Sequence, residues 1–140
     1  MNIAILSRGE ALYSTKSLVS AGEARNHTMT VLDPSYCSLA VENGKAVLYF
    51  QNEKLDNIQA IIPRIGASNT YFGTNVVRHF ESMGIFSVAS SEGISNSRDK
   101  WACFQILAHH KISVPRTIYA SFFEYEEQLK TFNGKPIIIK

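Results

Sequence analysis

The chain has 140 residues, of which 45% are hydrophobic and 19% charged, and its formal net charge is +2. This composition is typical of a globular protein with a core, and the length allows one domain or slightly more than one. The small charge and the lack of any basic run argue against direct binding of DNA or RNA. No apolar run approaches the roughly 20 residues of a membrane span, and no signal-peptide pattern is present, so we expect a cytoplasmic protein without a membrane partner.

The first third of the chain predicts a strand–helix–strand unit. Residues 2–7 form a short apolar run typical of a buried parallel strand, residues 12–25 predict a helix, and residues 28–32 predict a second strand. The connection should be a right-handed crossover between parallel strands. The helix residues expected to face the sheet are Leu18, Ala21 and either Ala24 or Arg25.

Asp33 ends the second predicted strand, where a dinucleotide-binding fold carries the acid that binds ribose. The loop after the first strand has only Gly9, whereas the dinucleotide fingerprint requires a series of glycines. We therefore interpret Asp33 as a turn residue, and a nicotinamide-dependent oxidoreductase is disfavoured. A receiver-like domain is disfavoured too, because Ser7-Arg8-Gly9 stands where such a domain needs clustered acids.

A hairpin and then a further strand follow. Asn43-Gly44 is a two-residue turn signal within residues 38–51, and we expect this hairpin to extend one edge of the sheet. Residues 60–62 predict the next strand, and Arg64 stands at its carboxyl end, the edge where open α/β sheets bind ligands. A guanidinium pairs with carboxylates and phosphates in a bidentate manner, or it anchors a loop through backbone carbonyls. Both interpretations of Arg64 stay open.

The next segments predict the end of the first domain. A helix is expected after Ser68-Asn69-Thr70 and should end at Gly84, and residues 85–89 predict a short strand. Residues 90–95 are polar, so we expect a flexible connector there and a boundary between two units. The residues expected on the packed face of the helix are Phe72, Val76, Phe80 and Met83.

Ser97-Arg98-Asp99-Lys100 predicts a turn that opens a helix, with Asn96 or Ser97 as the cap and Asp99 in the first turn. Lys100 would then lie beside free N–H groups, where a phosphate is favourable, and a solvated surface lysine is the alternative. The apolar residues that follow at helical spacing are Trp101, Phe104, Ala108 and Ile112. Later in the chain, residues 115–117 and 136–140 predict strands, and residues 124–132 predict a helix.

The order of these motifs resembles the start of the ATP-grasp fold in the RimK-like glutamate ligases, the type that modifies small-subunit ribosomal protein six. The segments that carry the resemblance run from the N-terminus almost to the last residue. They are Ile3-Ala4-Ile5-Leu6-Ser7-Arg8, Leu32-Asp33-Pro34, Ile62-Pro63-Arg64-Ile65-Gly66, Ser97 to Lys100, Pro115-Arg116-Thr117 and Pro136 to Lys140.

The resemblance implies an α/β fold. Residues 1–93 would form a pre-ATP-grasp, Rossmann-like parallel sheet with helices on both faces and a hairpin, and residues 94–140 would begin the ATP-grasp domain. Lys100 and Lys140 match lysines that contact ATP in the family. Ser7, Arg8 and Arg64 are candidates for lining the substrate cleft.

The resemblance also implies a reaction. In the family, ATP phosphorylates a carboxylate of a protein or small-molecule acceptor, and the amine of glutamate displaces the phosphate. The glycine-rich phosphate loop and the ligands of Mg²⁺ (or Mn²⁺) lie beyond the residues given, so we expect an N-terminal fragment that is inactive by itself. Its apolar last strand predicts self-association as a homo-oligomer, or disorder beyond about Tyr119. A non-catalytic α/β binding or regulatory module is the alternative function.

Overall fold

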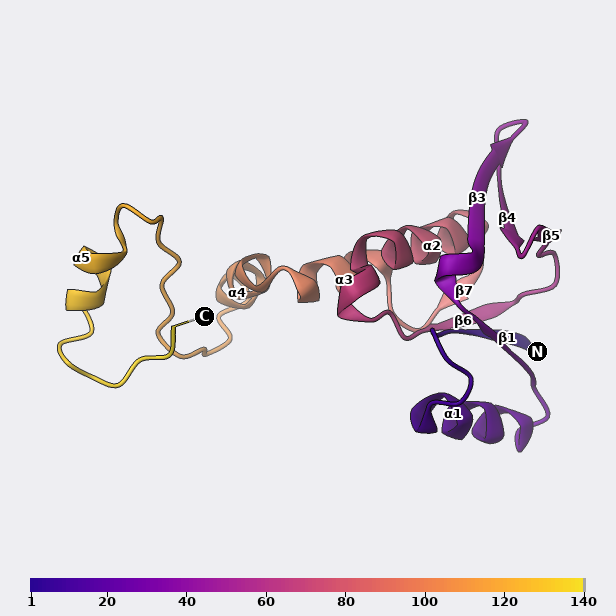
Figure 1. The fold of residues 1–140 in the computed structure, drawn as a ribbon, viewed down its shortest axis with the longest axis horizontal. Helices are drawn as coiled ribbons and strands as arrows, with labels where there is room; N and C mark the ends of the chain where they lie inside the picture. The colour runs from indigo at the N-terminus through magenta and orange to yellow at the C-terminus, as the bar shows by residue number, and fades with distance from the viewer. Residues whose placement is uncertain (140) are drawn as a thin grey trace. The chain divides into compact units, whose positions relative to one another are not determined.

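A computed structural model describes residues 1–139 of the chain (Figure 1). The chain divides into two compact units, Met1–Asp99 and Lys100–Lys140. Lys140, one of the two lysines predicted to bind nucleotide, lies outside the described residues. No helix within residues 1–139 is both long and apolar enough to cross a membrane.

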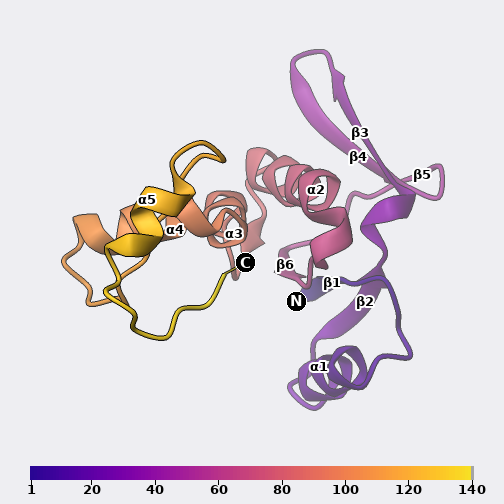
Figure 2. The same cartoon turned by 60° about the vertical axis from the view of Figure 1, so that its left-hand side comes forward.

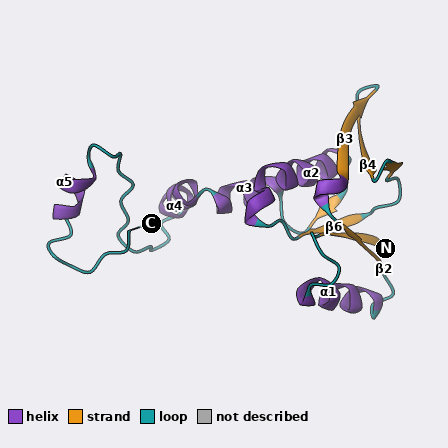
Figure 3. Cartoon of the chain, in the orientation of Figure 1, coloured by secondary structure: helices purple, strands orange, loops and turns teal. Residues whose placement is uncertain are grey.

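The first unit is built on a four-stranded parallel sheet, which confirms the predicted strands and their direction (Figure 3). Ile5 of the first strand lies opposite Val31 on one side and Ile62 on the other, so this strand is central. In spatial order the strands are β2 (Thr28–Leu32), β1 (Asn2–Leu6), β6 (Ala60–Pro63) and β7 (Phe86–Ser87).

Helices cover both faces of this sheet, as the resemblance implied (Figures 1 and 2). The helix α1 (Tyr13–Glu23) lies on one face. The helix α2 (Thr70–Ser82) lies on the other, where α3 (Ser91–Arg98) packs against it. The α/β fold class is therefore confirmed.

The expected inner face of α1 was wrong in part. Thr15 and Gly22 are the buried residues of this helix, whereas Ala21, Ala24 and Arg25 are exposed. A Cβ on Gly22 would stand 2.2 Å from Sδ of Met29, so α1 packs closely against β2 at this glycine. The buried face of α1 therefore includes Gly22 and not the neighbouring Ala21.

The hairpin forms where the sequence predicted it, but it does not extend the main sheet. Its turn residues Asn43 and Gly44 have φ of 50° and 75°, as a tight hairpin turn requires. Val47 and Leu48 are buried, and Leu48 belongs to the core cluster that includes side chains of α2. The hairpin therefore buries apolar side chains against α2 and does not pair with an edge strand of the main sheet. The strands form a separate antiparallel sheet in the order β3 (Cys37–Glu42), β4 (Lys45–Phe50) and β5 (Glu53–Lys54).

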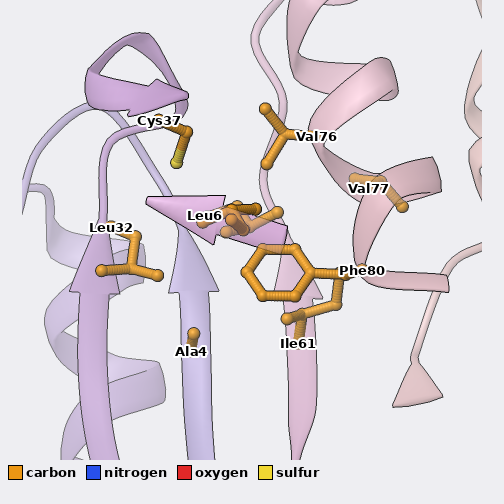
Figure 4. Close-up of a cluster of buried hydrophobic side chains, with 9 residues drawn as sticks. Ala4, Leu6, Leu32, Cys37, Ile61, Val76, Val77 and Phe80 are labelled. Carbon is orange, nitrogen blue, oxygen red and sulfur yellow. The ribbon is translucent and has the colours of Figure 1, made fainter. Parts of the chain in front are cut away.

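The core of the first unit lies between the main sheet, the hairpin and α2. Figure 4 shows side chains of the sheet meeting those of α2 around Phe80. Phe80, Val76 and Val77 of α2 are fully buried. The expected face of this helix is therefore largely confirmed, although Phe72 at its first turn is exposed.

The segment predicted as a flexible connector is the helix α3. The Ser90 hydroxyl caps this helix by accepting a hydrogen bond from the Gly93 amide at 3.0 Å. Ser91 donates from its backbone amide and its hydroxyl to the carboxylate of Glu81, at 2.9 and 2.6 Å. These bonds to α2 order a polar segment whose composition alone suggests a loop.

Helix α3 also changes the local structure around Ser97. Asn96 and Ser97 lie in its last turn instead of capping the next helix, and the Ser97 hydroxyl donates to the carbonyl of Ile94. Asp99 has an extended conformation and precedes α4 (Lys100–His109), so it is not in the first turn of that helix. Helix α4 therefore begins at Lys100, later than the predicted cap at Asn96 or Ser97, and Lys100 lies in its first turn as predicted.

The second unit has helices but no strand among its described residues. It contains α4 and α5 (Tyr125–Lys130), and the latter confirms the predicted short helix. The strands predicted at 115–117 and 136–140 do not form within residues 100–139, because neither segment pairs with a hydrogen-bonded neighbour strand. No residue of α4 is buried, and Ala108 and Ile112 are exposed, so the predicted apolar face is covered only near Trp101 and Phe104.

Candidate functional site

The carboxyl edge of the main sheet gathers the residues that the sequence singled out in the first unit. Because β1 and β6 are adjacent and parallel, the residues that follow them emerge at the same edge. Ser7 and Arg8 follow β1, and Arg64 follows β6. The structure therefore brings these three predicted residues to one edge of the sheet.

Ser7 is buried at this edge, with only 3% of its surface exposed. Its hydroxyl shares a hydrogen bond of 2.9 Å with the hydroxyl of Thr15 in α1. Its backbone amide donates to the carbonyl of Leu32 at 2.9 Å, which continues the ladder between β1 and β2. Ser7 thus ties the end of β1 to α1 and to β2.

Arg8 is exposed and reaches across to the loop after β6. Its Nη1 donates to the Ser68 hydroxyl at 2.9 Å. Its guanidinium also lies beside Gly66, where an added Cβ would stand 3.4 Å from Nη2. Arg8 is therefore engaged in holding the loop that begins at Arg64.

The loop of residues 64–66 is held by three further contacts. The Arg64 amide donates to the carbonyl of Leu6 at 2.9 Å. The Ile65 side chain packs into the space left by Gly73 of α2, where a Cβ would stand 2.6 Å from Cγ2 of Ile65. The carbonyl of Ile65 accepts a hydrogen bond of 2.6 Å from Nη2 of Arg98, at the end of α3. The backbone on both sides of Arg64 is therefore fixed.

A cleft of about 430 Å³, which we call the arginine cleft, lies between this loop and the end of α3. Every residue that lines it belongs to the first unit. The lining residues are Pro63, Arg64, Ile65, Gly66, Ile94, Ser97 and Arg98. The lining carries two guanidinium groups and no carboxylate, so the cleft is cationic.

Arg64 differs from the other two arginines at this edge. It is exposed, and its guanidinium makes no hydrogen bond or ion pair with any side chain or carbonyl of residues 1–139. Two ion pairs within the same described part join Lys54 to Asp56 and Lys130 to Glu127, and neither involves an arginine. Arg64 is thus a cation whose donors remain available to a ligand.

Arg98 was not predicted as a site residue, because within Ser97-Arg98-Asp99-Lys100 only Lys100 was expected to bind a ligand. Its contact with Ile65 spans 33 positions in sequence, and no local pattern reports such a contact. The available signal was Ser90, which begins a helix that places Arg98 in its last turn.

The second unit holds the two predicted nucleotide residues at its ends. Lys100 is exposed at the first position of α4. A separate cleft of about 520 Å³ lies among residues 115–120, α5 and residues 136–139, with mainly apolar lining. Arg116 at this cleft donates to the carbonyl and hydroxyl of Thr131 at 2.9 and 2.8 Å and lies 4.8 Å from the centre of the Phe132 ring.

Neither a metal cluster nor an activated thiol is found among the described residues. No three His, Cys, Asp or Glu side chains of residues 1–139 come together in a way that would hold a metal ion. Cys37 and Cys103 are free thiols. Burial, and to a smaller extent the charge of Asp33, raises the pKa of Cys37 to about 11, which disfavours the nucleophilic thiolate.

Comparison with known proteins gives consistent matches. Residues 1–94 match the family model of the RimK PreATP-grasp domain. The full chain is 44% identical over 141 residues to proteins named probable alpha-L-glutamate ligase from Vibrio atlanticus (strain LGP32) and Trichodesmium erythraeum (strain IMS101). The match covers 100% of this chain and 47% of each relative, so the chain spans about half the length of the curated relatives it matches.

Solved structures with the same fold are also ATP-grasp proteins. A RimK domain protein ATP-grasp from Sphaerobacter thermophilus DSM 20745 superposes with a TM-score of 0.63 at 20% identity, over 83% of this chain and 40% of that chain. The ATP-grasp ligase PsnB, complexed with precursor peptide PsnA2 and AMPPNP, gives a TM-score of 0.67 at 14% identity, over 95% of this chain and 51% of that chain. At these identities the similarity shows the fold alone.

Proposed function

Because this chain belongs to the RimK pre-ATP-grasp domain family, we propose that it forms the N-terminal portion of an ATP-dependent glutamate ligase. The observation that carries the proposal is the 44% identity, along the entire chain, to proteins named probable alpha-L-glutamate ligase. Identity at this level over every element supports a shared role for the segment in both proteins.

The proposed reaction joins glutamate to a carboxylate. ATP transfers its γ-phosphoryl group to a carboxylate oxygen of the acceptor, and ADP leaves. The amine of glutamate then forms a bond to the acyl carbon, phosphate departs with the former carboxylate oxygen, and the amine loses a proton. The finer proposal is that the acceptor is the C-terminus of a small-subunit ribosomal protein, in the cytoplasm.

Lys100 and Lys140 are the proposed nucleotide contacts. Lys100 stands at the start of α4, where the free N–H groups of the helix favour a phosphate and a lysine adds a full positive charge. We assign residues 1–93 to the pre-ATP-grasp domain and residues 94–140 to the beginning of the ATP-grasp domain.

Arg8 and Arg64 are the proposed substrate-side residues of the first domain. Their position at the carboxyl edge of a parallel sheet supports this role, because ligands bind at that edge in open α/β folds. Direct contact between Ser7 and substrate stays a prediction. The burial of its hydroxyl and its bond to Thr15 favour an indirect role, in which Ser7 supports the loop that carries Arg8.

We propose that the 140 residues do not catalyse ligation alone. The described residues provide no carboxylate cluster that fits Mg²⁺, so no step of the reaction is assigned to a metal held by this chain. Catalysis would use groups in the half of the relatives that this chain does not span.

The test compares two lysines of the second unit in the longer protein of which this chain would be a part. Lys100→Ala should weaken ATP binding about 10–100-fold, since it removes a charge-assisted hydrogen bond. Lys111→Ala removes the same charge from an exposed position just after the same helix and should leave the affinity unchanged. ATP titration by calorimetry measures both. Equal affinity of the Lys100→Ala variant and the parent protein would remove Lys100 from the nucleotide site.

A further inference from the structure

We propose that the arginine cleft is a carboxylate-binding site of the first unit, in which Arg64 binds the ligand and Arg98 positions Arg64. The site itself follows from the geometry of residues 63–98. The identity of its ligand as a glutamate-like carboxylate rests on the proposed ligase function.

Three arginines at one edge of the sheet differ in their contacts. Arg8 is engaged with Ser68, and Arg98 with the carbonyl of Ile65. Of these three, only Arg64 has a guanidinium without a partner among residues 1–139. A guanidinium has five donors in a fixed planar fork, which matches a carboxylate in a bidentate manner.

The loop that carries Arg64 is preorganised. The backbone of Arg64 is fixed by its bond to Leu6, and Ile65 is held on one side by Gly73 and on the other by Arg98. A loop that is already ordered loses little conformational entropy when a ligand arrives. Arg98 and Gly73 therefore hold the backbone next to Arg64 in place, and neither has to contact the ligand for this role.

The lining of the arginine cleft combines apolar and cationic groups. Pro63 and Ile94 provide apolar walls beside the two guanidinium groups, and the volume of about 430 Å³ falls in the range of small-molecule sites. A ligand with an aliphatic chain that ends in a carboxylate could pack its chain against the apolar residues and pair its carboxylate with Arg64. A triphosphate would need several uncommitted cations, whereas this cleft offers one.

Two sources provide this chemistry in the proposed reaction: free glutamate, and an acidic side chain or C-terminus of the acceptor. The probes are therefore L-glutamate, an N-acetylated tetraglutamate peptide, L-glutamine, inorganic phosphate and ATP. Each is titrated into the ¹⁵N-labelled 140-residue chain, and the backbone amides are followed by NMR. We expect saturable shifts at residues 64–66 and 97–98 with glutamate, with the peptide or with both, and weaker binding of glutamine.

Substitutions separate the binding role from the positioning role. Arg64→Ala should weaken carboxylate binding about 10–100-fold, the range for a charge-assisted hydrogen bond. Arg64→Lys should be nearly as weak, because an ammonium cannot form the bidentate pair. Arg98→Lys keeps a donor for the carbonyl of Ile65 and should bind within about threefold of the parent, whereas Arg98→Met keeps the stem but not the donor and should lose about tenfold.

Arg25→Ala is the matched control for charge. Arg25 is exposed, belongs to the same unit and donates to the carbonyl of Ala21, away from the lining of the arginine cleft. Its removal changes the net charge as Arg64→Ala does and should leave the affinity unchanged. If the role of Arg98 were purely structural, Arg98→Lys and Arg98→Met would both lower the unfolding temperature. The two variants would then bind the carboxylate with equal affinity.

Three results would overturn the proposal. They are the absence of saturable shifts with glutamate and with the peptide, equal shifts with phosphate or ATP, and equal loss in Arg64→Ala and Arg25→Ala. This test is independent of ligation. Carboxylate binding that depends on Arg64 would stand even if the longer protein formed no ADP with glutamate, and that second result would refute only the ligase function.

Discussion

The two units of the chain differ in how completely they bury their apolar side chains. Met1–Asp99 contains every buried residue among those described, including the cluster around Phe80. In the second unit, Phe122, Phe123 and Ile138 are largely exposed, and no described residue of this unit is buried. The first unit therefore has its own hydrophobic core, and the second does not.

Two short segments show why the units differ. Residues 60–63 and 136–139 are both apolar and rich in isoleucine, and they correspond to the strands predicted at 60–62 and 136–140. The first pairs with β1 and β7 and becomes β6, whereas the second has no pairing strand and remains irregular. A β-branched sequence becomes a strand only where the fold offers a partner for its backbone groups.

The largest effect that would sharpen this contrast comes from truncating one phenylalanine in each unit. Phe80→Ala should reduce the free energy of unfolding by about 3–5 kcal/mol, because Phe80 is fully buried and its loss leaves a cavity. Phe123→Ala should change it by less than about 0.5 kcal/mol, because Phe123 is 91% exposed. Urea denaturation measures both changes. Equal losses of unfolding free energy in the two variants would contradict the difference in burial between the units.

A second contrast concerns pH and the buried thiol of the first unit. The pKa of Cys37 is raised from 9.0 to about 11 by burial and by Asp33, so the folded state holds the thiol proton more tightly than the unfolded state. This contribution to stability is fully present below pH 9 and is lost as the pH rises towards 11, by about 2 kcal/mol.

Other groups titrate in the same range, so the measurement is the difference between the parent and Cys37→Ala. Between pH 8 and pH 11, the free energy of unfolding from urea denaturation should fall by about 2 kcal/mol less in the variant than in the parent. Cys103 of the second unit is half-buried and should react first with a thiol reagent at pH 8. Identical pH dependence in the parent and the variant would exclude a shifted Cys37.

The smallest effect expected is at the cap of α3. Ser90→Ala removes the hydroxyl that accepts from Gly93 and should cost about 1 kcal/mol. Hydrogen exchange should quicken in α3 and leave α5 unchanged, since the cap belongs to the first unit. Faster exchange in both helices would show that the two units unfold together.

Local patterns predicted much of the first unit and less of the second. The apolar runs of β1 and β6, the alternating pattern of β2 and the Asn43-Gly44 turn are local signals, and each formed as expected. Helix α3 was missed because the bonds that order it run to Glu81, which local composition does not report.

The candidate site shows the same limit. Arg64 was identified because a residue after a parallel strand must lie at the carboxyl edge of the sheet. Arg98 was not identified, because its partner is a backbone carbonyl 33 positions away and appears only once α3 has packed. The predicted face of α1 was wrong in part for a related reason, because the packing of Gly22 against Met29 of β2 is a tertiary contact that the local pattern does not report.

The most direct test of the proposed function is ADP formation by the longer protein when ATP, an acceptor and one amino acid at a time are supplied. We expect ADP formation that depends on glutamate, with one glutamyl residue added to the acceptor by mass spectrometry, and no turnover by the 140 residues alone. ADP formation that is indifferent to glutamate, or full turnover by the 140-residue chain, would contradict its assignment as the N-terminal portion of a glutamate ligase.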